Sequence, residues 1–436
     1  MENGKSIENA KLKIENETNS QFSTFNSPLK KLLKGVEVEW KPLGEVGEVR
    51  MCKRILKEQT SDDGEIPFYK IGTFGREPNS YISTELFEEF RSKYNYPKIG
   101  EVLISASGTI GRSVIFDGED AYFQDSNIVW IENDESRVLN KFLFYSYQIA
   151  KWQIAKGGTI QRLYNENLKK TKIPFPCPDN PKKSLEIQKE IVRILDSFTE
   201  LTAELTAELT ARKQQYSYYR EQLLMVNDKG LMLNGEKVAW RSLGEVAELV
   251  RGNGFPKTDF TETGIPAIHY GQIYTYYKTF ATETKSFVSP ETAKKLKKVN
   301  TGDVVITNTS ENLEDVGKAV VYLGKEEAVT GGHATIIKPS KEISGKYFAY
   351  FTQTEGFASQ KRRLAKGTKV IDVSASDMAK IKIPVPSKEE QARIVSILDK
   401  FDVLTTSISE GLPKEIELRQ QQYEYYRNQL LMFNDK

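Results

Sequence analysis

Basic and tyrosine side chains form two groups in this chain whose residue types suit contact with a polyanion. Arginine can donate two hydrogen bonds to guanine in the major groove of DNA, and lysine can neutralise phosphate. The candidate DNA contacts in the first half of the chain are Arg50, Arg54, Tyr69, Arg76, Arg112, Lys156 and Arg162. Those in the second half are Arg251, Lys257, Tyr270, Tyr274, Lys361, Arg362, Arg363 and Lys369. A solvated surface is the alternative, because a net charge of +2 gives no nucleic-acid signal by itself.

Motifs for catalysis are missing from the sequence. No G-x-x-x-x-G-K followed by Ser or Thr occurs, so an ATP-binding loop of that kind is excluded. The Asn-Pro-Pro-Tyr or Asp-Pro-Pro-Tyr motif with which amino-methyltransferases hold a flipped adenine is also absent. His269 and His333 have no nucleophile motif beside them, and Cys52 and Cys177 lack metal-ligand spacing. We therefore expect no catalytic residue, no metal site and two reduced thiols.

A repeat about 200 residues long organises the chain. Residues Glu186–Phe198 (EIQKEIVRILDSF) return as Glu389–Phe401 (EEQARIVSILDKF), and Arg212–Met225 (RKQQYSYYREQLLM) returns as Arg419–Met432 (RQQQYEYYRNQLLM). Shorter echoes keep the same order, whereas the segments between them differ. The pattern predicts two copies of one module, alike in their helices and unlike in their globular parts.

Apolar residues at alternating spacings of three and four predict a helical arm in each copy, with a coiled-coil seam. A first helix over residues 186–225 would be about 60 Å long, too long to lie within one small domain. The second helix should break near Gly411–Pro413. Because neither seam is stable alone, we expect the arms to pack antiparallel. The expected seam consists of Ile191, Leu195, Phe198, Leu205 and Leu209 with Ile394, Leu398, Phe401, Leu404 and Ile408.

The first arm also carries the four-residue repeat LTAELTAELTA at residues 201–211. One unit of four residues advances a helix by about 6 Å, so gain or loss of a unit would change the length of the arm. The repeat can act as an adjustable spacer. It can equally be no more than a stretch of good helix formers.

Strand patterns bounded by glycine recur in order in both globular segments, with a helix pattern at residues 141–152 in the first and at residues 346–360 in the second. Each segment closes at Ile-Pro-x-Pro just before its arm. The predicted fold class is α+β: two mixed α/β domains related by approximate twofold symmetry, joined by two long helices that form an antiparallel coiled coil. The expected boundaries are a disordered tail at 1–28, a first globular domain at 29–182, a central helical arm at 183–230, a second globular domain at 231–386 and a C-terminal helical arm at 387–436.

No apolar run approaches the roughly 20 residues of a membrane helix, and the N-terminus lacks an apolar signal core. We therefore expect a cytoplasmic protein with no membrane contact.

The repeated RxQQYxYYRxQLLM ends, the TAEL units and the Ile-Pro-x-Pro motifs before each arm resemble the DNA specificity subunit of type I restriction-modification enzymes, particularly the type IC branch. The likeness covers about residues 29–436. It implies two target recognition domains that read an asymmetric, two-part sequence in double-stranded DNA, with a spacer set by the arms. It further implies a subunit without a catalytic site of its own, in a bacterial or archaeal cell.

The resemblance also implies partners and cofactors. Two methylation subunits would bring S-adenosylmethionine, and two motor-nuclease subunits would bring ATP and Mg²⁺, giving an adenine methyltransferase and ATP-dependent endonuclease. The candidate partner contacts are Tyr216, Tyr219, Arg220, Tyr423, Tyr426 and Arg427, which lie either on the exposed sides of the arms or within the seam. An alternative function is a non-catalytic coiled-coil scaffold with two protein-binding heads. An autonomous enzyme is a third, disfavoured by the missing motifs.

Overall fold

The computed structural model describes residues 33–154, 161–227, 229–407 and 409–433, and it divides into two compact units. The first unit contains the chain up to Glu204 together with residues from Glu417 onward, and the second unit contains Leu205–Ile416. The predicted tail at 1–28, the candidate contact Lys156 and the seam residue Ile408 lie outside the described residues.

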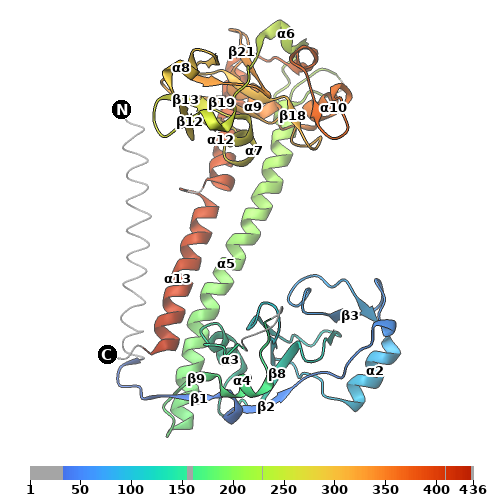
Figure 1. Ribbon diagram of the computed structural model, residues 1–436, viewed down its shortest axis with the longest axis vertical. Helices are drawn as coiled ribbons and strands as arrows, with labels where there is room; N and C mark the ends of the chain where they lie inside the picture. Colours follow the sequence, from blue (N-terminus) through green and yellow to red (C-terminus); the bar gives the residue numbers. More distant parts are fainter. Residues whose placement is uncertain (1–32, 155–160, 228, 408, 434–436) are drawn as a thin grey trace. The chain divides into compact units, whose positions relative to one another are not determined.

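The first unit is built on an antiparallel sheet and a smaller mixed sheet (Figure 1). The larger sheet has the order β2 (Gly47–Arg50), β8 (Ile128–Asn133), β5 (Val102–Ser105) and β6 (Ser113–Ile115). The smaller sheet has the order β4 (Tyr81–Ile82), β3 (Ile66–Tyr69) and β7 (Tyr122–Phe123), and β1 (Val38–Pro42) pairs with β9 (Lys172–Pro176). The helices are α2 (Thr84–Lys93), α3 (Asn140–Tyr147) and α4 (Asn165–Lys170).

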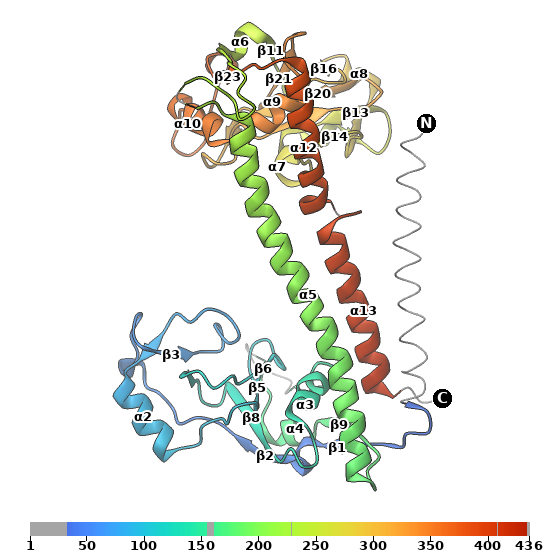
Figure 2. The ribbon, with the colours of Figure 1, turned by 180° about the vertical axis from the view of Figure 1, so that it is seen from behind.

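The second unit repeats this frame and extends it (Figure 2). Its main sheet has the order β11 (Ala247–Arg251), β21 (Ala334–Pro339), β17 (Val304–Thr307), β19 (Ala319–Tyr322) and β14 (Phe280–Ala281). A second sheet has the order β12 (Phe260–Thr261), β15 (Ser286–Val288), β13 (Ile265–Ile268), β20 (Ala328–Thr330) and β16 (Lys297–Val299). Two-stranded pairs join β10 (Trp240–Ser242) to β23 (Lys382–Pro384) and β18 (Thr309–Ser310) to β22 (Ile371–Asp372).

The helices of the second unit differ more from the prediction than its strands do. The sequence pattern predicted one helix over residues 346–360, but the structure has two, α9 (Gly345–Phe351) and α10 (Glu355–Leu364). The division falls at Thr354, whose hydroxyl accepts a hydrogen bond from Phe357 N and caps α10. The short helices α6 (Leu243–Val246), α7 (Tyr270–Thr275), α8 (Pro290–Ala293) and α11 (Ala375–Met378) complete the unit.

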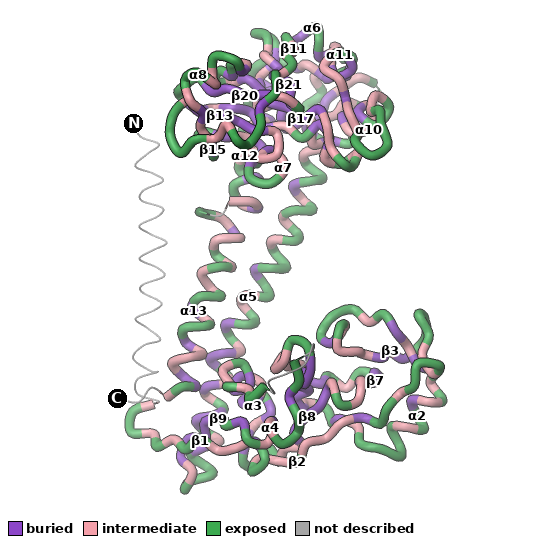
Figure 3. Tube along the Cα trace, viewed as in Figure 1, coloured by how far each residue is buried: buried purple, intermediate pink, exposed green. Residues whose placement is uncertain are grey.

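The central strand of each main sheet separates two apolar cores, because successive side chains of a strand point to opposite faces. In β5, Val102 and Ile104 join the core that includes the long helix, and Leu103 joins the core beneath the smaller sheet. In β17, Val304 and Ile306 lie in one core and Val305 in the other. All residues of both strands are buried, as Figure 3 shows for β17.

The arms consist of α5 (Pro181–Leu224), α12 (Lys388–Thr406) and α13 (Leu412–Met432). In the first unit, the rings of Phe198 and Tyr426 stack with their centroids 5.2 Å apart, and Ile191 shares a buried cluster with Leu430. In the second unit, Tyr216 stacks on Phe401 at 5.9 Å. Later residues of α5 thus contact earlier residues of the helix that packs against it. This confirms the predicted antiparallel helix pairing within each unit (Figures 1 and 2). The predicted α+β class is also confirmed.

Most predicted seam residues lie where the two helices pack. Those that are buried are Ile191, Leu195, Phe198, Leu205, Ile394 and Leu398, and those that are half-buried are Leu209, Phe401 and Leu404. Asp402 and Thr405, which the apolar pattern did not include, are buried beside them. The predicted break is confirmed between Thr406 and Leu412, where Gly411 has a φ of +82° and an added Cβ would lie 2.6 Å from Val403 O.

Three further findings concern membrane helices, metal sites and the two cysteines. Within the described residues, no helix has the length and apolar character needed to cross a bilayer. The same residues contain no cluster of three or more His, Cys, Asp or Glu side chains that could hold a metal ion. Cys52 and Cys177 are buried free thiols, and burial raises the pKa of Cys52 to about 12.

Candidate nucleic-acid interface

Two of the predicted contacts in the first unit meet at one cavity. Arg54 and Arg162 line a cavity of about 290 Å³ with two further cations, Lys57 and Lys70. The turn between β7 and β8, residues 124–127, also lines it. Both arginines are exposed, and Arg54 Nη2 lies 2.9 Å from Asp125 Oδ2. The cavity therefore combines four cations with one carboxylate, a charge balance that suits a phosphate group.

The other predicted contacts of the first unit lie apart from this cavity. Arg50 Nε donates to Glu132 Oε2 at 2.8 Å on the neighbouring strand, and Arg112 Nη1 donates to Phe74 O at 3.0 Å. Tyr69 stacks on Phe123 at 5.9 Å, and burial raises the pKa of the Tyr69 hydroxyl. Arg76 is exposed.

In the second unit, aromatic rings occupy the corresponding region. Tyr270 lies between Tyr274 and His333, with ring centroids 6.4 Å and 4.9 Å away. The Tyr274 hydroxyl donates to Thr309 O, and burial raises its pKa. Arg251 is exposed, and its Nη2 lies 4.0 Å from Asp372 Oδ2.

The remaining predicted contacts in the second unit are divided between buried and exposed positions. Lys361 is 6% exposed, its Nζ donates to Glu314 O at 3.1 Å, and desolvation lowers its pKa. With Arg362, Tyr274 and the unpredicted Lys318, it lines a cavity of about 660 Å³. Arg362 pairs with Glu355. Lys257, Arg363 and Lys369 are exposed.

The candidate contacts did not include Lys57, Lys70 and Lys318, which the structure places beside them. The candidates also omitted the turn residues Gln124 and Asn127, which line the first cavity. No residue pattern distinguishes such a turn.

Equivalent ion pairs and hydrogen bonds fix the globular part of each unit to its helical arm. Asp196 of α5 pairs with Lys141 at 2.7 Å and accepts a hydrogen bond from the Tyr145 hydroxyl at 2.6 Å. In the second unit, Asp399 of α12 pairs with Lys346 at 2.6 Å and accepts from the Tyr350 hydroxyl at 2.7 Å. The repeated sequence therefore places α3 and α9 on their helices in the same way.

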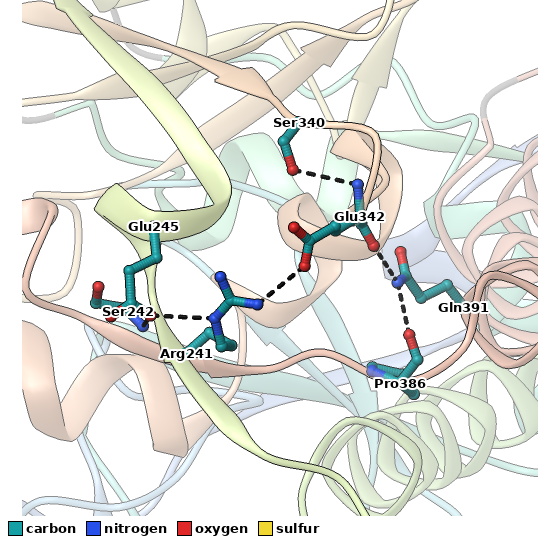
Figure 4. Close-up of polar contacts among 7 residues, drawn as sticks. All are labelled: Arg241, Ser242, Glu245, Ser340, Glu342, Pro386 and Gln391. Atoms are coloured by element: carbon teal, nitrogen blue, oxygen red, sulfur yellow. Dashed lines mark hydrogen bonds and ion pairs between the residues drawn. The ribbon is translucent and has the colours of Figure 1, made fainter.

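A glutamine provides a second fixed point in each unit. Gln188 Nε2 donates to Arg137 O at 3.0 Å, and Gln391 Nε2 donates to Glu342 O and Pro386 O, each at 2.9 Å. Figure 4 shows Glu342 as the hub of the second contact, because its carboxylate also accepts from Arg241 Nη1 at 2.9 Å. These contacts hold the start of α12 against the strands that carry the loops.

The six candidate partner contacts divide between the two alternatives: two are buried, Tyr219 is 38% exposed, and the other three bond to the globular parts. Tyr216 and Tyr426 are buried, and Tyr219 stacks on Phe401 at 5.9 Å. Arg220 donates to Gln353 at 3.2 Å, and Arg427 and Tyr423 donate to Gln148 at 3.3 Å and 2.6 Å. Tyr218 and Tyr425, which occupy matched positions in the repeat, are more exposed, at 61% and 49%.

The two units share a strand framework and the contacts that fix it to the helices, whereas their loops differ. This combination is typical of a protein with two different binding domains. The chain belongs to the family described as the type I restriction modification DNA specificity domain, whose model matches residues 35–212 and 235–418.

Relatives in bacteria support this membership. A type I restriction enzyme specificity subunit of Escherichia coli is 36% identical over 93% of this chain and 97% of its own length. A putative type I restriction enzyme specificity subunit of Haemophilus influenzae is 63% identical over 42% of this chain, a match that spans 46% of that relative. The fold is similar to the crystal structure of a type I restriction-modification S subunit from M. genitalium, with a TM-score of 0.52, 17% identity and coverage of 92% of this chain and 98% of that one.

Proposed function

We propose that this chain is the sequence-specific DNA-recognition subunit of a type I restriction-modification complex. One observation carries the proposal: the sheet strands of the first unit recur in the same order in the second, which adds further strands, while the loops differ in sequence. Two unlike heads on a repeated scaffold select an asymmetric target with two parts, since a palindrome would require identical heads.

The proposed recognition domains are residues 29–182 and 231–386, with arms at 183–230 and 387–436. The proposed DNA contacts that are exposed cations are Arg54, Arg76, Arg162, Arg251, Lys257, Arg362, Arg363 and Lys369. Buried Lys361 acts in this proposal through the shape of its cavity. The arms set the number of unread base pairs between the two half-sites.

We further propose that two methylation subunits and two motor-nuclease subunits assemble on this chain, and that it is non-catalytic. S-adenosylmethionine would be bound by the former, and ATP and Mg²⁺ by the latter. Tyr218 and Tyr425 are exposed at matched positions in the repeat, and each lies edge-on against the tyrosine that follows it. This supports two equivalent docking sites for two copies of one partner. The proposed place of action is the cytoplasm of a bacterial or archaeal cell.

The test is to coexpress the chain with its cognate methylation subunit and to map modified adenines across a genome. The expected result is one asymmetric sequence in two short parts with a constant gap. A palindromic site, or modification without sequence preference, would contradict the proposal. Binding to duplex DNA should also weaken steeply with salt, whereas a scaffold for proteins alone would show no such dependence.

Deletion of one TAEL unit from residues 201–211 tests the role of the arms. We expect both half-sites to persist and the gap to change by about one base pair, because the unit shortens the helix by about 6 Å. An unchanged gap would show that the arms do not set the spacing.

A further inference from the structure

The turn between the smaller sheet and the main sheet is strained in both units. Among the described residues, four other than glycine have a positive φ, and two of these are Ser126, at 60°, and His333, at 65°. Ser126 lies in the turn from β7 to β8, and His333 lies in the corresponding turn from β20 to β21. Left-handed backbone at a non-glycine residue is unfavourable and is often retained at functional sites. Because left-handed backbone occurs in this turn of both units, the side chains that the turns expose are candidates for ligand binding.

In the first unit, the turn directs amide donors toward the cationic cavity. Gln124 Oε1 accepts from Ile71 N at 3.0 Å, and Asn127 Oδ1 accepts from Ser107 Oγ at 2.7 Å. Both side chains line the cavity, and neither NH₂ group donates a hydrogen bond to a described residue. With each oxygen already accepting one hydrogen bond, the two NH₂ groups remain as donors for a ligand.

In the second unit, the turn presents an imidazole instead. His333 is exposed, and its Nδ1 lies 2.9 Å from Thr309 Oγ1, which orients the ring and directs Nε2 away from this contact. The turn packs closely on Phe255, since a Cβ added to Gly331 would lie 2.0 Å from the Phe255 Cβ. Aromatic packing thus replaces the cationic cavity of the first unit.

We propose that these two turns are the base-reading elements of the protein, with Asn127 and Gln124 reading one half-site and His333 reading the other. This rests on the proposed function. Amide donors suit the acceptors of the major groove, guanine N7 and O6, adenine N7 or thymine O4. Arg162, Lys57 and Lys70 surround the first turn and would hold the adjacent phosphates.

The test uses the full chain assembled with its methylation partner and a randomised duplex library, with modified sites sequenced. Asn127→Ala should reduce discrimination about tenfold at one or two base pairs of a single half-site. His333→Gly should do the same in the other half-site only. Because glycine accepts the left-handed backbone, His333→Gly should fold without loss of thermal stability.

Two further variants keep the test decisive if Asn127→Ala folds poorly. Asn127→Asp keeps the acceptor for Ser107 and removes the donors, so it should change the preferred base at the same positions. Ser126→Gly removes the strain and leaves Asn127 in place, so it should preserve the sequence preference.

A uniform loss of affinity for every sequence, or an unchanged preference in Asn127→Ala, Asn127→Asp and His333→Gly, would overturn the assignment of the turns. If the unaltered protein modified no two-part site, the proposed function itself would fail.

Discussion

In the first unit, Arg162 forms an isolated strand bridge with Ser107, whereas in the second unit Asp372 occupies the same place and pairs with Thr309. The frame around the two positions is the same, because Leu163 N donates to Ala106 O and Val373 N donates to Asn308 O, each at 2.8 Å. A cation and an anion thus occupy one position of a repeated frame. Packing determines the frame, and it leaves the side chain at this surface position free to vary with the ligand.

The largest expected effect concerns what the two units share, the aromatic contact between helices. Phe198→Ala should lower the free energy of unfolding of the first unit by about 3 kcal/mol, because it leaves a cavity against Tyr426. Phe401→Ala should cost the second unit less, since Phe401 is only half-buried. Hydrogen–deuterium exchange resolved by peptide measures each unit separately. Phe198→Leu is the matched control, and equal losses in both units for either variant would contradict the comparison.

The carboxylates that mount each head should differ in their contribution. Asp399→Asn should destabilise the second unit by about 2 kcal/mol, and Asp196→Asn the first by about 1 kcal/mol. The reason is solvent screening: the side chain of Lys346 is 20% exposed and that of Lys141 is 54% exposed. Urea unfolding, monitored in each unit by hydrogen–deuterium exchange, measures both losses of unfolding free energy. Tyr350→Phe and Tyr145→Phe, which keep the ion pairs, should show a smaller difference, and a reversed order for the Asp variants would refute the screening argument.

The opposite charges of Arg162 and Asp372 should have opposite effects on the affinity for duplex DNA. Arg162→Ala should weaken binding to duplex DNA about fivefold and reduce the salt slope by about one. Asp372→Ala should strengthen binding about twofold at low salt, because it removes an anion close to Arg251. Titrations at several salt concentrations distinguish the two. Equal weakening by both variants would mean that this position does not face DNA.

The smallest expected effect is the pH dependence that Asp402 gives the second unit. Burial raises the pKa of Asp402 and the nearby Asp399 adds to this, against the lowering effects of a hydrogen bond with Thr406 and of Lys278 and Lys346. The folded protein then holds this proton more tightly than the unfolded chain, so stability falls as the pH rises from the ordinary carboxyl pKa through the raised pKa of the folded state.

Asp402→Asn should therefore raise the melting temperature by about 2 °C at neutral pH and have no effect near about pH 3, where both states are protonated. The matched residue of the first arm is Thr199, and Thr199→Val should give no pH-dependent change. A gain that persists at low pH would mean that packing, and not charge, causes it.

The arms and most strands could be predicted because repeats and periodic apolar residues report burial directly. The break was predictable from Gly411 and Pro413, since neither residue suits a helix interior, and the structure ends α12 at Thr406 and begins α13 at Leu412 with Pro413 in its first turn. Asp402 and Thr405 were missed because polar residues in a seam interrupt the apolar period that reveals it. Site geometry was harder to predict: whether Lys361 is buried or Arg54 pairs with Asp125 depends on pairing between segments far apart in sequence.

The first unit takes Tyr426, Leu430 and Leu431 into its core from the last helix of the chain. During synthesis, those side chains leave the ribosome only after the whole second unit has emerged. The first unit therefore cannot complete its core during most of synthesis, and its apolar surface stays exposed to chaperones and proteases. A premature stop codon in the final turns would consequently damage the part of the protein that is made first.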